Sequence, residues 1–265
     1  MTDPFGVIAV QFDAHLFFSR IFTTSSPFWG ALVTTVYVSV LSQTFGTILG
    51  LFTALALRSR HRLWRILAFL YVLLVRGTPV VVQIFFIYFG ANLFLGFDLF
   101  PRSADILGLS FSGPVLAGIV ALSINEGAFM SEIIRAGIES IDHGQTEAAL
   151  SVGMTHREAM RRIVLPQAAR VIVPPLGNEF NNMIKGTSLL SFIGVYEIFQ
   201  DAQTVYSADF MPVEIFAAVA FWYLVLTTIW GLIQVQIERR LGASELVEGA
   251  TFSERVLGIR PRHNL

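Results

Sequence analysis

The sequence predicts an all-α integral membrane protein with about five transmembrane helices. Of its 265 residues, 54% are hydrophobic and only 14% are charged, and the mean hydropathy is +0.65. Soluble domains carry charged residues at about 25%. Long apolar runs alternate with short polar segments, and each run reaches or exceeds the ~20 residues that a helix needs to cross a bilayer. We therefore expect most of the chain to lie in a membrane.

The composition also excludes several classes of function. The net charge is -1 and the chain has a single lysine, so we expect no basic surface for nucleic acid. The absence of cysteine excludes a disulfide framework, an iron-sulfur cluster and a thiolate zinc site. The five histidines show no metal-ligand spacing. We therefore expect neither a metal site nor a bound cofactor.

Residues 1–26 lack the basic start and the small-residue cleavage site of a signal peptide, so we expect them to be retained as an external N-terminal segment. Their phenylalanine-rich patch, residues 16–22, is interpreted as an amphipathic segment at the membrane surface. The first span is expected over residues 27–57, and Arg58 begins a basic stretch that ends it. Gly46 and Gly50 form a small-xxx-small face, for which packing within the chain is favoured over dimerisation.

The second apolar run, residues 66–96, is interrupted by Arg76-Gly77-Thr78-Pro79. Proline removes a helix hydrogen bond and glycine loosens the turn, so we expect a kink or break there and treat these four residues as a hinge or gating segment. Arg76 has two open interpretations. Deep in the membrane it would need a partner or a watery cavity, whereas at the boundary it would only extend toward the headgroups.

Residues 97–112 are expected to form an external loop, and a third span is expected over residues 112–138. Asn125 and Glu126 interrupt the apolar face near the middle of that span. At its end Glu132, Arg135 and Glu139 have the spacing of a local charge ladder on one helix face.

A fourth span is expected over residues 174–199, with Pro174 and Pro175 in its first turn. Asn178, Asn182 and Lys185 share one of its faces, and Glu179 lies beside them. Such a face must look into the protein or an aqueous path.

A short external loop leads from there to the last span, residues 213–235. Residues 242–265 are expected to form a cytoplasmic tail with a weak helix over residues 253–259.

The basic residues predict the orientation. Of the 18 lysines and arginines, fourteen fall on one side of these spans: Arg58, Arg60, Arg62, Arg65, Arg135, Arg157, Arg161, Arg162, Arg170, Arg239, Arg240, Arg255, Arg260 and Arg262. Because basic residues concentrate on the cytoplasmic side, the N-terminus is expected outside and the C-terminus inside.

Residues 140–170 form a polar island between apolar runs, and we name them the docking loop. Thr146 is expected to cap a first short helix with Glu147 in its first turn, and Gly153 to close that helix in the left-handed conformation. Thr155 and Glu158 have the spacing of a capping box for a second short helix, which is expected to end near Leu165 because Pro166 follows.

The docking loop resembles a known family. Its spacing, E-A-A-x3-G-x9-I-x-L-P from Glu147 to Pro166, is similar to the cytoplasmic loop by which the membrane subunits of bacterial ABC importers fit into their ATPase. The segments Arg76–Pro79, Gln83–Tyr88, Leu176–Phe180 and Lys185–Leu189 resemble the polar amino acid (His/Gln/Arg type) branch. The resemblance covers about Phe28 to Leu241 and implies the type I ABC importer permease fold over residues 27–241, in the bacterial cytoplasmic (inner) membrane.

This resemblance implies partners rather than catalysis by the chain itself. An ABC ATPase subunit, a periplasmic or extracellular solute-binding protein and a second permease subunit, as a homodimer or a heterodimer, are expected. The chain has no phosphate-binding loop, since its lysine is followed by Gly186, so ATP is expected to be bound and hydrolysed by the ATPase subunit. The residues expected to seat in the ATPase are Glu147, Ala148, Ala149, Gly153, Met154, Arg157, Glu158 and Arg161.

The expected substrate path comprises Asn125, Glu126, Asn178, Glu179, Asn182 and Lys185. Lys185 and the amides suit the carboxylate of an amino acid, and Glu126 or Glu179 suits its ammonium group. The competing interpretation is that these residues hold helices together by hydrogen bonds. We favour a structural or gating role for Asn178 and Glu179, and the path for Glu126 and Lys185.

One departure from the family bears on this assignment. Gly186 stands where the family usually has an aspartate, which removes a partner for Lys185. The alternative function is an ion-coupled carrier or channel that works without an ATPase and uses Glu126 and Lys185 as ion-pathway residues.

Overall fold

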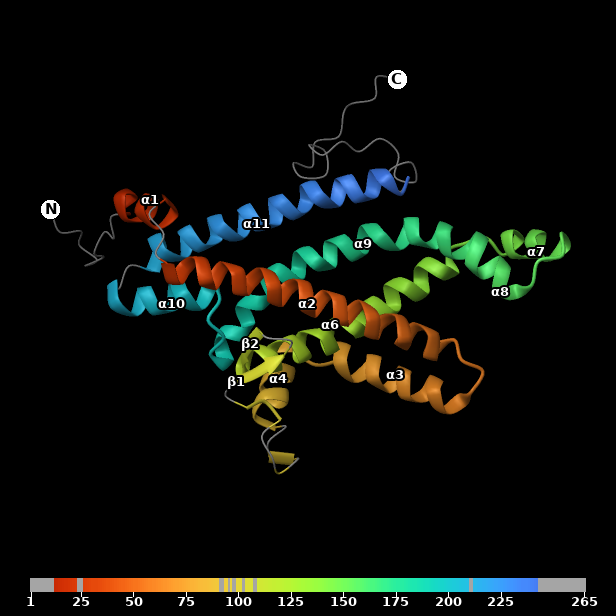
Figure 1. Ribbon diagram of the computed structural model, residues 1–265, viewed down its shortest axis with the longest axis horizontal. Coiled ribbons are helices and arrows are strands. Elements are labelled where there is room, and N and C mark those ends of the chain that lie inside the picture. The colour runs from red at the N-terminus through yellow and green to blue at the C-terminus, as the bar shows by residue number, and fades with distance from the viewer. Residues whose placement is uncertain are drawn as a thin grey trace, which may run out of the picture.

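The computed structural model describes residues 12–22, 26–90, 93–94, 96, 99–101, 103–106, 109–209 and 212–242. Most of the long helices run along the longest axis of the molecule (Figure 1). The predicted all-α class is confirmed, with the addition of one small two-stranded sheet. The core lies where four helices and a 3-10 segment meet, around buried Val38, Ile84, Leu122, Met183 and Leu190.

The two best-packed helices are α2 (Ser26–Leu57) and α6 (Gly113–Glu139), which lie side by side. Their backbones approach closely at two glycines. A Cβ atom on Gly46 would lie 2.6 Å from the Cβ of Glu126, and one on Gly50 would lie 2.4 Å from the Cβ of Met130. The predicted small-residue face therefore packs within the chain, because no larger side chain fits at either position.

The predicted break in the second apolar run is confirmed. Helix α3 (Arg62–Arg76) ends at the arginine, and α4 (Val80–Phe85) begins directly after Pro79 and continues as a π-helix, Phe86–Gly90. The two parts are bent by 109° relative to each other.

The predicted external loop over residues 97–112 is wrong in part. Ser103–Ile106 (β1) pairs antiparallel with Leu109–Ser112 (β2), and Ser103 lies opposite Ser112. Strands of four residues are too short to show a clear alternation of apolar and polar residues. The turn-forming and charged residues nearby therefore predicted a loop. The hairpin leads straight into α6.

The predicted charge ladder at the far end of α6 is confirmed, with Arg135 bonded to Glu132 at 2.8 Å and to Glu139 at 2.7 Å.

The predicted boundaries around the fourth span are wrong. The helix α8 (His156–Ala159) does not end near Leu165, because a π turn, Met160–Val164, carries the chain directly into α9 (Leu165–Gly186). The wider π turn keeps the chain helical just before Pro166, which cannot donate a backbone hydrogen bond. Pro174 and Pro175 consequently lie inside α9 and not in its first turn.

The segment after α9 also differs from the prediction. The span does not reach residue 199, since a 3-10 helix, Thr187–Ile193, ends at Gly194 with φ +82°. A helix, α10 (Ile198–Asp209), replaces the predicted external loop. Buried Glu197 caps its start by accepting hydrogen bonds from the backbone N–H groups of Phe199 (2.9 Å) and Gln200 (2.7 Å). Glutamate is not among the residues preferred at the start of a helix, so the sequence around Glu197 does not predict this cap.

The last long helix is α11 (Pro212–Arg240), and α1 (Ala14–Phe22) packs against it (Figure 1). Among the described residues, three helices, α2, α6 and α11, are long and apolar enough to cross a membrane, and the bent pair α3–α4 makes up to four. Helix α9 is the remaining predicted span and is more polar than these. The chain is thus a multi-pass membrane protein. The helix predicted over residues 253–259 lies outside the described residues.

Candidate functional site

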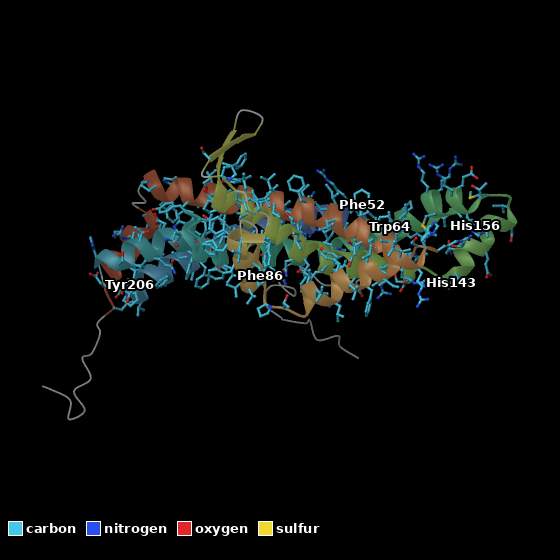
Figure 2. All side chains as sticks on the ribbon, turned by 90° about the horizontal axis from the view of Figure 1, so that it is seen from below. Phe52, Trp64, Phe86, His143, His156 and Tyr206 are labelled. Atoms are coloured by element: carbon cyan, nitrogen blue, oxygen red, sulfur yellow. The ribbon has the colours of Figure 1, made fainter. Side chains whose placement is uncertain are left out.

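The docking loop lies at one end of the molecule, as Figures 1 and 2 show for α7, α8, His143 and His156. Helix α7 (His143–Ser151) begins one turn earlier than predicted. Its cap is Asp142, whose carboxylate accepts a 2.7 Å hydrogen bond from the N–H of Gly144, and not Thr146. Aspartate is at least as good a cap as threonine, and it comes first along the chain. Glu147 therefore lies in the second turn, away from the end of the helix dipole.

The predicted closure of α7 at Gly153 is confirmed. Its φ is +88°, the N–H of Gly153 donates to the carbonyl of Leu150 (2.9 Å), and that of Met154 donates to the carbonyl of Ala149 (3.1 Å). This pair of bonds is a Schellman motif, which ends a helix abruptly and reverses the chain. The motif turns α8 back beside α7.

The predicted capping box at the start of α8 is also confirmed. The Glu158 carboxylate accepts hydrogen bonds from the backbone N–H (3.0 Å) and the hydroxyl (2.9 Å) of Thr155, and the Thr155 hydroxyl accepts one from the N–H of Glu158 (3.3 Å). The bond from the Thr155 backbone, followed by that from its hydroxyl, holds the pKa of Glu158 below its usual value. The box therefore contains a carboxylate at neutral pH.

The surface of the docking loop is polar and accessible. Glu147 and Ala148 are exposed, Met154 is half-buried, and Ala149 is buried. A hollow of about 460 Å³ is lined by Arg157, Glu158, Arg161 and Arg162. The docking loop thus presents charges of both signs, an exposed Glu147 and a hollow with three arginines, which suits a polar protein partner.

The structure divides the expected substrate path into separate groups. Glu126 is buried and its carboxylate accepts a 2.9 Å hydrogen bond from the side-chain amide of Gln43 on α2. The neighbouring Asn125 contacts a different element: its side-chain amide donates a 3.0 Å hydrogen bond to Gln83 on α4. Both residues thus tie α6 to other helices.

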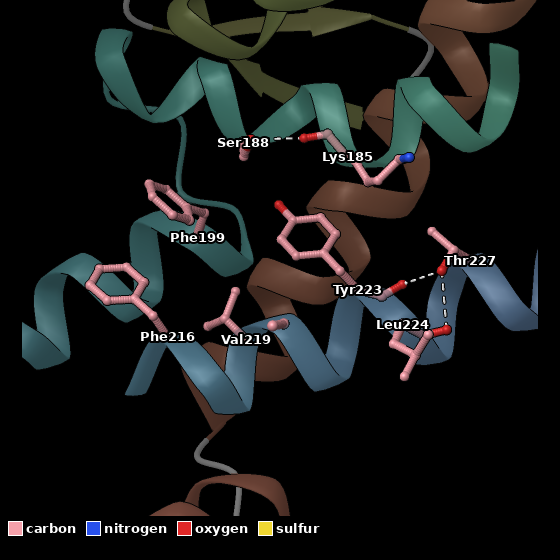
Figure 3. Close-up of a pocket in the computed structure, with 9 residues that line it drawn as sticks. Lys185, Ser188, Phe199, Phe216, Val219, Tyr223, Leu224 and Thr227 are labelled. Carbon is pink, nitrogen blue, oxygen red and sulfur yellow. Dashed lines mark hydrogen bonds between the residues drawn. The ribbon is translucent and has the colours of Figure 1, made fainter. Parts of the chain in front are cut away.

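The polar residues of α9 form the second group. Asn178, Asn182 and Lys185 are exposed in the single chain, and Glu179 is half-buried. Lys185 borders a pocket of about 470 Å³ beside Tyr223 and Thr227 of α11 (Figure 3). Within the part of the chain that the structure describes, the Lys185 side chain forms no ion pair and no hydrogen bond with Glu126.

The segment Arg76–Pro79 lies at the break between α3 and α4. The Arg76 guanidinium carbon is 5.3 Å from the centre of the Phe129 ring, a distance at which a cation is attracted to an aromatic face. Arg76 is exposed in the single chain, so both interpretations of its depth in the membrane stay open.

Three polar residues outside the expected substrate path belong to this region: Gln43, Tyr71 and Gln83. The Tyr71 hydroxyl donates a 2.6 Å hydrogen bond to the carbonyl of Ile124, next to Asn125. Gln43 and Gln83 each stand within an apolar run of the sequence. A buried amide in a membrane needs a hydrogen-bond partner, so this pattern could have identified both residues.

Known proteins match the chain over most of its length. A family model described as the inner membrane component of binding-protein-dependent transport systems matches residues 46–243. The L-cystine transport system permease protein TcyB of Bacillus subtilis (strain 168) is 41% identical over 81% of this chain and 88% of its own length. The glutamine transport system permease protein GlnP of Escherichia coli (strain K12) is 35% identical over 78% and 89%.

A solved structure agrees with these relatives. The crystal structure of an amino acid ABC transporter with histidines superposes with a TM-score of 0.74 at 36% identity, covering 87% of this chain and 99% of that one. The chain that contains this fold, this helical break and this docking loop aligns with these proteins over 78–87% of its length. The chain therefore belongs to the inner membrane components of binding-protein-dependent transport systems, the permease subunits of ABC importers.

Proposed function

We propose that this chain moves polar amino acids across the bacterial cytoplasmic (inner) membrane, driven by a separate ABC ATPase subunit. The observation that carries the proposal is the docking loop, where a Schellman turn at Gly153 and a capping box at Thr155 hold two short helices at the end of the molecule. Its inner residues Val164 and Ala168 pack in the core, whereas Glu147, Ala148 and Arg157 remain exposed at its surface. It suits a partner that pushes on the spans.

The ATPase subunit docks on the residues that the sequence singled out. Glu147 and Ala148 are exposed for contact, while buried Ala149 keeps α7 against its neighbour. Arg157 and Arg161 border the hollow of the docking loop and attract an acidic edge of the ATPase. Because α8, the π turn and α9 form one continuous rod, a movement of the docking loop is passed directly to α9.

The solute path follows the polar face of α9. Asn178, Asn182 and Lys185 are exposed in the single chain, yet a polar face cannot be turned to lipid. We place this face at a water-filled path beside a second permease subunit, with Lys185 toward the solute's carboxylate. Glu126, bonded to Gln43, and Glu179 support the helices behind it, and Asn125 on α6 also faces the path. An external solute-binding protein delivers the amino acid.

The test is reconstitution in proteoliposomes with the ATPase subunit, a panel of amino acids and their binding proteins. Hydrolysis of ATP stimulated by one loaded binding protein, together with uptake, is the expected result. In Glu147→Ala, uptake and co-purification of the ATPase are both expected to be lost.

The matched control is His61→Ala, an exposed residue in the turn between α2 and α3 whose side chain caps nothing. It is expected to behave as the wild type. Transport that needs no ATP and follows a proton or sodium gradient would overturn the proposal in favour of an ion-coupled carrier.

A further inference from the structure

The break between α3 and α4 leaves backbone carbonyl groups that a continuous helix would have satisfied. Pro79 has no N–H group, so it cannot donate to the carbonyl of Val75, four residues earlier. The side-chain amide of Gln83 takes its place and donates to that carbonyl at 2.7 Å. A side chain from the second half of the broken span thus completes the hydrogen bonding of the first.

The two preceding carbonyls are satisfied as well. The N–H of Gly77 donates to the carbonyl of Leu73 at 3.0 Å, and the Thr78 hydroxyl donates to the carbonyl of Leu74 at 2.9 Å. Unpaired backbone groups are costly inside a membrane, where no water replaces the missing partner. With these bonds in place, the 109° bend is a braced elbow and not a loose hinge.

Gln83 also joins this elbow to the middle of α6. Besides its bond to Val75, its amide nitrogen lies 2.9 Å from the Thr78 hydroxyl oxygen and 3.1 Å from the Thr78 carbonyl oxygen. Its oxygen accepts the 3.0 Å hydrogen bond from Asn125. One side chain therefore connects the end of α3, the turn and the centre of the third span.

The hydrogen-bond partners determine the orientation of both side-chain amides, that is, where the nitrogen and the oxygen of Gln83 and Asn125 lie. A carbonyl can only accept, so Gln83 must turn its nitrogen toward Val75. Its oxygen then faces α6, and Asn125 must present its nitrogen. The oxygen of Asn125 is thereby turned away from Gln83, and it forms no hydrogen bond with the described part of the chain.

We propose that Gln83 is a positioning residue for transport: it braces the elbow and orients Asn125, so that the Asn125 oxygen is presented as an acceptor for the ammonium group of an amino acid. This inference rests on the proposed function, because it places Asn125 at the solute path. Gln83 itself does not touch the solute. It acts on the solute through Asn125, whose position depends on the braced elbow.

The elbow is tested first, without any transport measurement. The chain contains no cysteine, so Leu70→Cys and Phe86→Cys place two spin labels on exposed positions on either side of the bend. One narrow distance distribution is expected in the parent chain and in the control Val82→Ala, a neighbour on the same helix that is also exposed. Gln83→Met and Gln83→Glu both remove the hydrogen-bond donor to the carbonyl of Val75, so both are expected to broaden the distance distribution. A distribution that stays narrow in both would overturn the bracing role.

The effect on transport is measured as the amount of amino acid taken up per ATP hydrolysed, at saturating loaded binding protein. In Gln83→Met and in Asn125→Ala this ratio is expected to fall roughly tenfold while stimulated hydrolysis is retained, whereas a merely misfolded variant would lose both together. The double variant is expected to fall no further than either single one, because Gln83 acts through Asn125.

The outcomes separate this inference from the proposed function. A broadened elbow with an unchanged ratio would overturn the role of Asn125 at the path. If the uptake per ATP in the variant carrying both Gln83→Met and Asn125→Ala falls by the two single fold-changes multiplied together, the claim that Gln83 acts through Asn125 is overturned. Absence of ATP-driven uptake in the parent chain would refute the proposed function, and the elbow measurement would stand by itself.

Discussion

The side-chain amide of Gln43 on α2 donates a 2.9 Å hydrogen bond to the carboxylate of Glu126 on α6, within the tightest helix pair of the molecule. Both residues are buried, with 6% and 5% of their surface exposed. The close approach of the backbones at Gly46 brings them together, because a Cβ atom there would collide with Glu126. Glu126 therefore belongs structurally to the α2–α6 pair.

Gln43→Leu is expected to destabilise the protein by about 1–3 kcal/mol, because it leaves a buried carboxyl group without its donor. The measurement is unfolding of the purified protein in detergent. Thr44→Val is the matched control, since Thr44 is exposed and bonds only to the backbone of its own helix. If both variants unfold alike, the bond contributes nothing to stability.

Gly50→Ala is expected to cost about 1–3 kcal/mol, because the added Cβ would lie 2.4 Å from that of Met130 and force α2 and α6 apart. Gly231→Ala provides the comparison, since nothing lies within 4 Å of a Cβ atom added there. Thermal unfolding of the two variants in the same detergent compares them directly. Equal unfolding temperatures would contradict the close packing of the two spans.

Replacement of Gly153 tests the Schellman turn of the docking loop. Nothing lies within 4 Å of a Cβ atom added there, so only the φ of +88° opposes a side chain. Gly153→Val is expected to weaken binding of the ATPase subunit about tenfold, because a left-handed residue with a Cβ atom costs roughly 1–2 kcal/mol. Gly153→Asn is expected to bind nearly as the wild type, since asparagine tolerates this conformation. Equal binding by both variants would show that the turn geometry does not matter.

The capping box predicts a pH dependence of the docking loop. Because the pKa of Glu158 is lowered in the folded protein, its contribution to stability is fully present above the usual glutamate pKa of about 4.3. That contribution is lost as the pH falls through the lower, folded pKa. Hydrogen exchange at the Thr155 amide, corrected for intrinsic rates, is therefore expected to speed up on acidification.

Glu158→Gln is the control for this measurement. Glutamine can still accept from Thr155 but does not titrate, so protection of the amide should not change with pH in this range. A wild-type amide whose protection is equally constant would argue against the carboxylate as the partner of Thr155.

Sequence patterns predicted most of the fold where the signal is local. The apolar runs predicted α2, α6 and α11, the arginines after Leu57 marked the end of the first span, and Pro79 marked the break. In the docking loop, Gly153 and the Thr155–Glu158 pair behaved as predicted because caps and left-handed turns depend on a few adjacent residues. The cap at Asp142 was missed because two capping residues competed within one turn.

The arrangement of the polar residues inside the membrane could not be predicted in the same way. Composition by itself showed that Asn125, Glu126 and Lys185 needed polar surroundings, since an apolar medium cannot satisfy them. Only the tertiary structure showed that Glu126 pairs with Gln43 and that Asn125 pairs with Gln83. It also placed Lys185 at a separate pocket beside α11. These partners lie 83 and 42 residues apart in the chain, so only the packing of whole helices, set by close contacts such as that at Gly46, brings them together.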